Sequence, residues 1–160
     1  MQENSKANKL TKILFIIYMI ALFWIIIFKF GVPFFGLGYM RKINLVLFKE
    51  SLMVNGRLDF SEIIMNAVIF MPLGVYSGIL LKKWSTGKKI LLYFLISLIC
   101  EVSQFILGVG TSDITDIITN TLGGIIGSVI YKGIEKVSKD KVAAQKLINV
   151  IATIGTIFMG

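Results

Sequence analysis

Long apolar stretches with few or no charged residues are the feature that most limits how this chain can fold. Residues 13–28 carry no charge, and stretches of similar character recur near 61–81, 90–107 and 114–131. A helix needs about 20 mainly apolar residues to cross a hydrocarbon core of roughly 30 Å. With a mean hydropathy of +0.82, the chain has more apolar surface than one small soluble core could bury. The sequence therefore predicts a membrane protein.

The predicted fold is all-α: a polytopic membrane helix bundle of four to five transmembrane helices with an outer interfacial segment. The bundle is expected to form a single transmembrane domain over residues 1–160. Its spans are expected at residues 13–29, 61–81, 90–107 and 113–131. A fifth span over residues 142–160 is left open, because this stretch is long enough only if Gln145 and Lys146 extend toward the aqueous interface.

Lysine clusters on alternating loops predict how the bundle is oriented. Most of the 17 Lys and Arg residues fall before the first span, between the second and third, and after the fourth. The clusters are Lys6, Lys9 and Lys12; Lys82, Lys83, Lys88 and Lys89; and Lys132, Lys136, Lys139, Lys141 and Lys146. Because basic loops stay in the cytoplasm, we expect the N-terminus on the cytoplasmic side. The net charge of +8 then reflects topology and attraction to membrane lipids, and no nucleic-acid partner is predicted.

The scarcity of two residue types removes several classes of chemistry. The chain has no histidine and a single cysteine, Cys100. Disulfides within the chain, zinc sites built on histidine or paired cysteines, and mechanisms that use a histidine base are therefore excluded.

Carboxylates and amides enter three spans from the outer side at similar depth. Within each span their spacing of three, four or seven residues places them on one helical stripe. The residues of this candidate functional cluster are Asp59, Glu62, Asn66, Glu101, Gln104, Asp113, Asp116 and Asn120. Since antiparallel spans can bring the three stripes together, the sequence predicts one ligand-binding site that faces outward. No catalytic residue is assigned.

Most of this cluster also has a purely structural explanation. Asp59 and Glu62 form a D-x-x-E capping pattern, and Ser112 followed by Asp113 is typical of an N-cap and a first-turn acid. The three amides can act as interhelical hydrogen-bonding groups: Asn66, Gln104 and Asn120.

Glu101 is the member that helix capping does not explain. A carboxylate inside a span is unfavourable by several kcal/mol unless it is protonated, hydrated or paired. A pair with Lys29, Arg41 or Arg57, or simple protonation, would satisfy Glu101 without any function. Otherwise Glu101 marks a functional site. With Asp113 and Asp116, it forms the candidate set for Mg²⁺ or Ca²⁺, because hard cations prefer oxygen ligands.

Two other regions carry weaker predictions. Residues 30–60 mix aromatic and basic side chains, which is typical of an interfacial helix or a re-entrant hairpin and could cover the carboxylates. In the fourth span, small residues recur every four positions, in the pairs Gly123 with Gly127 and Gly124 with Ser128. This spacing predicts close helix packing, either inside the bundle or between copies in a homo-oligomer.

Three motifs occur in order along the chain. They are Asn66-x-x-x-Phe70-x-Pro72-Leu73-Gly74, Glu101-x-x-Gln104 and Asp113-x-x-Asp116-x-x-x-Asn120-x-x-Gly123-x-x-x-Gly127. With the upstream segment Ile43–Phe48, they resemble the VanZ-like family of small bacterial membrane proteins over about residues 41–131. Two positions depart from that family's pattern: Thr111 stands where many members have arginine, and Leu47 stands where the outer segment has proline. The missing arginine argues against a phosphate or carboxylate ligand held by that residue.

The resemblance implies a multi-pass protein of the bacterial cytoplasmic membrane, in a family named for low-level resistance to the lipid-anchored glycopeptide teicoplanin. The leading hypothesis is a resistance or cell-envelope protein whose outer cluster engages the lipoglycopeptide, membrane lipid or a lipid-linked cell-wall precursor. The amine of teicoplanin-type molecules suits an anionic site. Two alternatives remain open: a divalent-cation-dependent enzyme that acts on lipid-linked cell-wall precursors, and a proton-coupled transporter or flippase that uses Glu101 as its proton carrier.

Overall fold

Five helices dominate the part of the chain that the structure describes. The computed structural model describes residues 2–28, 40–48, 53–54, 57–58, 60–138 and 140–159. The helices are α1 (Gln2–Phe28), α2 (Ser61–Leu80), α3 (Thr86–Leu107), α4 (Ile114–Val137) and α5 (Lys141–Met159). All five are long and apolar enough to cross a membrane. The all-α membrane bundle is therefore confirmed, and the stretch left open at the C-terminus is a fifth helix.

The helix bounds follow the predicted spans, with extensions at the polar ends. Helix α3 begins at Thr86 rather than at residue 90, because Ser85 caps it and accepts a hydrogen bond from the Lys88 backbone N–H at 3.4 Å. Helix α4 continues to Val137 instead of ending near residue 131.

Two short strand pairs were not predicted from the sequence. Strand β1 (Met40–Asn44) pairs in parallel with β4 (Val109–Asp113), which places Asn44 opposite Asp113. The connection between α3 and α4 is extended, because Gly108 ends α3 in the left-handed conformation and the chain then continues into β4. Strands β2 (Met53–Val54) and β3 (Arg57–Leu58) pair in antiparallel fashion.

The predicted interfacial segment is described only in part. Residues 29–39, 49–52, 55–56 and 59 lie outside the described residues. The described parts of 30–60 contain strands β1 to β3 rather than an interfacial helix.

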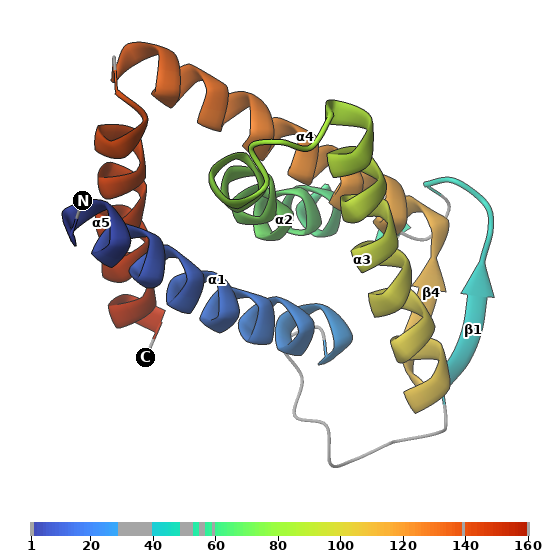
Figure 1. The fold of residues 1–160 in the computed structure, drawn as a ribbon. Helices are drawn as coiled ribbons and strands as arrows, with labels where there is room; N and C mark the ends of the chain where they lie inside the picture. The colour runs from blue at the N-terminus through green and yellow to red at the C-terminus, as the bar shows by residue number, and fades with distance from the viewer. Residues whose placement is uncertain are drawn as a thin grey trace.

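The bundle has two chemically different ends. Figure 1 shows the N-terminus of α1 beside α5 on one side of the molecule, and the β1–β4 pair on the opposite side. We call the end where α3 meets β4 the carboxylate end, because it holds Glu101 and Asp113. The other end, which holds the turn between α2 and α3 and the last turns of α4, is the lysine end.

Helices α2 and α4 touch backbone to backbone. A Cβ atom added to Gly123 would lie 2.1 Å from the Ala67 carbonyl oxygen, and one added to Gly127 would lie 1.9 Å from the Met71 carbonyl oxygen. From the other side, a Cβ on Gly74 would lie 2.0 Å from the carbonyl oxygen of Gly124. The predicted close packing of these small residues is therefore confirmed, and it occurs inside the bundle.

The hydrophobic core lies where α1, α2 and α3 meet. Its buried members are Leu22, Ile26, Phe70, Leu73, Tyr93, Ile96 and Cys100. The Tyr18 hydroxyl of α1 donates to the Ile69 carbonyl of α2 at 2.8 Å, which ties α1 to the pair formed by α2 and α4. Large apolar side chains also point outward, such as Ile20 at 67% exposure and Val129 at 63%. Such surfaces suit contact with lipid.

Helix α5 is joined to α1 by a buried hydrogen-bond network. The Gln145 side-chain amide donates to the Thr11 hydroxyl at 2.8 Å and to the side-chain oxygen Oδ1 of Asn8 at 3.0 Å. The Thr11 hydroxyl donates to Asn149 Oδ1 at 2.9 Å. Gln145 is only 2% exposed, so the expectation that it extends toward the interface is wrong. The reason is that α1 supplies polar partners, which let Gln145 remain inside the bundle.

The contact between α2 and α4 predicts a clear difference between two glycine substitutions in α4. Gly127→Ala should lower the thermal unfolding temperature in detergent, because overpacking a close contact is unfavourable by about 1–3 kcal/mol. Gly133→Ala is the matched control, because a Cβ at Gly133 meets nothing within 4 Å. Equal unfolding temperatures for the two variants would contradict the close contact.

Candidate functional site at the carboxylate end

Glu101 is buried at the point where α3 meets β4. Its side chain is 3% exposed, and Oε2 accepts a hydrogen bond from the Asp113 backbone N–H at 3.0 Å. The Glu101 carbonyl oxygen accepts a second bond, from the Ser112 hydroxyl at 2.7 Å. The Asp113 N–H stabilises the buried carboxylate, while the Ser112 hydroxyl ties the main chain of α3 to β4. Glu101 therefore joins the last turns of α3 to the strand that leads into α4.

Asp113 caps α4 and also reaches β1. Its Oδ1 accepts from the Thr115 backbone N–H at 2.8 Å, and its Oδ2 accepts from the Asn44 side-chain amide at 3.0 Å. Asp113 does cap a helix, as expected, but the prediction that Ser112 is the N-cap and Asp113 the first-turn acid is wrong. Asp113 is the N-cap, Ser112 belongs to β4, and the first-turn acid is Asp116. The strand pairing shifts these roles by bringing residues 109–113 into extended backbone.

Sequence reasoning did not place Asn44 and Thr115 in the site. Asn44 Oδ1 accepts from the Val46 backbone N–H at 3.1 Å, while the Phe48 backbone N–H donates to the Thr115 hydroxyl at 3.0 Å. These bonds hold the chain after β1 against the first turn of α4. The one available signal was the position of Asn44 within the upstream segment of the resemblance.

A cavity of about 260 Å³ opens beside Glu101. It lies between β1, α3, β4 and the start of α4, so β1 covers one side of it. Its polar lining residues are Asn44, Glu101, Ser112 and Asp113, and its apolar lining residues are Ile43, Leu45, Leu98, Val102, Phe105, Ile114 and Ile117. The exposed walls of the cavity are almost wholly apolar, and the buried side chains of Asn44, Glu101 and Asp113 lie behind them.

Two of the predicted cluster amides form interhelical hydrogen bonds. Gln104 Nε2 donates to the Ile26 carbonyl near the end of α1 at 2.7 Å, and Asn120 Nδ2 donates to the Ser97 hydroxyl of α3 at 2.9 Å. The structural explanation is therefore confirmed for these two residues. Neither of them lines the cavity beside Glu101.

The remaining cluster members lie apart from this cavity. Asn66 is 8% exposed and Asp116 is 2% exposed, and neither lines it. Glu62 lies in the first turn of α2 and is half-buried. Helix α2 has Phe60 as its N-cap, and the D-x-x-E capping pattern of Asp59 and Glu62 stays a prediction. Asp59 itself lies outside the described residues.

Two kinds of partner were predicted for Glu101: a divalent cation and a basic side chain. Within the described ranges, no three His, Cys, Asp or Glu residues are grouped so that they could hold a metal ion. Lys29 lies outside the described residues, as do the side chains of Arg41 and Arg57. The pairing of Glu101 with these residues stays a prediction.

Comparison with known proteins agrees with this architecture. The model of the VanZ/LLP1 family matches residues 15–135. Protein VanZ of Enterococcus faecium is 30% identical over 152 residues, which cover 94% of this chain and 88% of that protein. No solved structure matches the chain. The family match extends from α1 to the last turns of α4, and so it includes the residues that build the carboxylate end. The chain is therefore a multi-pass membrane protein that belongs to the VanZ/LLP1 family.

Proposed function

We propose that this protein contributes to resistance against teicoplanin-type lipoglycopeptides by binding the acyl chain of the antibiotic in the cavity beside Glu101. The observation that carries the proposal is this cavity, whose exposed walls are apolar and which has the buried carboxylates of Glu101 and Asp113 directly behind those walls. A teicoplanin-type molecule has an acyl chain and an amine. Apolar walls suit the chain, and an anionic group suits the amine.

The proposal requires that the carboxylate end faces outward, since these antibiotics act outside the cytoplasmic membrane. The distribution of lysine supports this orientation, because the loops at the lysine end carry the basic residues that stay in the cytoplasm. The N-terminus of α1 is then cytoplasmic.

Two other functions would use the same cavity. A cation-dependent enzyme that acts on lipid-linked cell-wall precursors would require Mg²⁺ or Ca²⁺ at Glu101 and Asp113, and a proton-coupled flippase would require proton transfer at Glu101. Among the described residues, no three His, Cys, Asp or Glu side chains lie close enough together to bind one cation. The apolar walls of the cavity support binding of an acyl chain over the cation-dependent enzyme.

Cysteine labelling tests the orientation. We expect a membrane-impermeant thiol reagent to label Gly110→Cys in intact cells, whereas Gly87→Cys should react only after the membrane is opened. Both positions accept a side chain, because a Cβ at Gly110 comes no closer than 3.9 Å to a neighbour and one at Gly87 meets nothing within 4 Å. Both variants also carry Cys100→Ala to remove background labelling. Labelling of position 87 in intact cells would reverse the orientation.

Glu101→Gln tests the binding proposal in an antibiotic-sensitive host. The substituted side chain can still accept the Asp113 N–H bond, but it loses the charge that would attract an amine. We expect acylated glycopeptide to bind the purified variant about tenfold more weakly or worse, because a charge-assisted contact is lost. Resistance should fall toward the level of cells without the gene, at equal protein abundance in the membrane.

Two further variants separate this result from a general effect of charge or packing. Asp140→Asn removes one carboxylate but keeps an oxygen that can accept the Val142 backbone N–H, so it should leave resistance unchanged. Val102→Phe places a larger side chain in the apolar cavity and leaves less room for an acyl chain. It should weaken resistance to an acylated glycopeptide more than to one without an acyl chain. Unchanged resistance and binding in Glu101→Gln would reject the proposal. A dependence of binding on added Mg²⁺ or Ca²⁺ would favour the enzyme instead.

A further inference from the structure

A second cavity lies at the lysine end of the bundle. It also has a volume of about 260 Å³, and its lining comes from α2, the turn after α2, α3, α4 and α5. Four of its lining residues are lysines: Lys82, Lys89, Lys132 and Lys141. They come from four different segments, so the fold rather than a single basic run brings them to one cavity.

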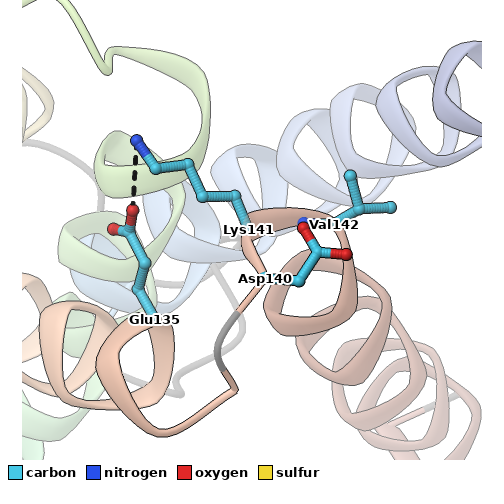
Figure 2. A network of polar contacts seen from close by, with 4 residues as sticks. All are labelled: Glu135, Asp140, Lys141 and Val142. Atoms are coloured by element: carbon cyan, nitrogen blue, oxygen red, sulfur yellow. Dashed lines mark hydrogen bonds and ion pairs between the residues drawn. The ribbon is translucent and has the colours of Figure 1, made fainter.

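The charges at this cavity are unbalanced. Glu135 is the one carboxylate among the lining residues that the structure describes, and it pairs with Lys141 at 3.3 Å between Oε1 and Nζ. Figure 2 shows this pair, with Asp140 turned away from it toward the backbone of Val142. Within the described residues, Lys82, Lys89 and Lys132 form no ion pair with a carboxylate. Several ammonium groups around one cavity repel each other unless an anion joins them.

The walls of the cavity are amphipathic. Tyr93 and Ser128 form its polar floor, where the Tyr93 hydroxyl is hydrogen-bonded to the hydroxyl groups of Ser128 and Ser77. Val129, which is exposed on the surface of α4, forms part of an apolar wall. Trp84 stands in the turn after α2, and tryptophan is enriched where a membrane meets water. The cavity therefore lies where a lipid headgroup and the start of its acyl chains would be.

We propose that this cavity binds the phosphate group of an anionic phospholipid. Lys89 is half-buried while the other three lysines are exposed, so Lys89 offers the innermost positive charge and Lys132 a second one from α4. Glu135 competes with the phosphate, because it holds Lys141 in an ion pair. Basic pockets between membrane helices are suited to anionic headgroups. The site is independent of the cavity beside Glu101 and of the function proposed for it.

Lipid titration of the purified full-length protein in detergent tests this site. Phosphatidylglycerol should raise the thermal unfolding temperature and form a one-to-one complex in native mass spectrometry, whereas phosphatidylcholine should do neither. In the double variant Lys89→Gln/Lys132→Gln, we expect phosphatidylglycerol to bind about tenfold more weakly or worse. The matched control is Lys9→Gln/Lys12→Gln, which removes two exposed lysines of α1 that do not line the cavity and should bind as the unchanged protein does.

A variant with the opposite effect guards against a loss that comes only from misfolding. Glu135→Gln removes the competing carboxylate and frees Lys141, so it should bind phosphatidylglycerol more tightly than the unchanged protein. Equal weakening in the two lysine double variants would mean diffuse attraction to the charged surface and would overturn the proposal. If inorganic phosphate alone raised the thermal unfolding temperature as far as phosphatidylglycerol does, and adding the lipid then had no further effect, a lipid ligand would be ruled out.

Discussion

The backbone contact between α2 and α4 is the interaction on which the rest of the structure depends. Gly123 and Gly127 let α4 approach the carbonyl groups of α2, and no side chain separates the two helices. This crossing fixes where α4 begins, and so fixes the position of Asp113 relative to Glu101 and β1. It also fixes where α4 ends, which sets Lys132 opposite the α3 residues of the second cavity. In a bilayer such close approach is favoured, because apolar side chains gain little by leaving lipid for protein.

The two ends of the bundle handle buried polar groups in different ways. At the carboxylate end, Glu101 and Asp113 use backbone N–H groups and the Asn44 amide as donors, so the acidic groups are held by local geometry. At the lysine end, one ion pair accounts for Lys141, and the neighbouring lysines remain as a positive cluster. The first arrangement suits a ligand with a cationic group and the second suits an anionic headgroup. A membrane protein can carry both because the two cavities lie at opposite ends of the same helices.

Sequence reasoning could predict the helices and single out Glu101, because hydropathy and the penalty for an intramembrane charge act locally. It could not predict the pairing of β1 with β4, since strands this short have no distinctive pattern and their partners lie far apart in the chain. The burial of Gln145 was missed for a similar reason: its partner Thr11 is 134 positions away. Stripes of polar residues led to the prediction of one ligand-binding site. They did not show that Gln104 and Asn120 bond to neighbouring helices rather than line the cavity beside Glu101.

Photo-crosslinking with an acylated glycopeptide that carries a photoreactive group on its acyl chain tests the central claim most directly. The claim is that the cavity beside Glu101 receives the acyl chain of the antibiotic. After irradiation of cells that express the protein, mass spectrometry should locate the label on apolar lining residues of α3 and α4, such as Val102, Phe105 and Ile117. An excess of antibiotic without the photoreactive group should abolish this crosslinking. Label confined to α1, α5 or the lysine end, or label that unlabelled antibiotic does not compete away, would contradict the account.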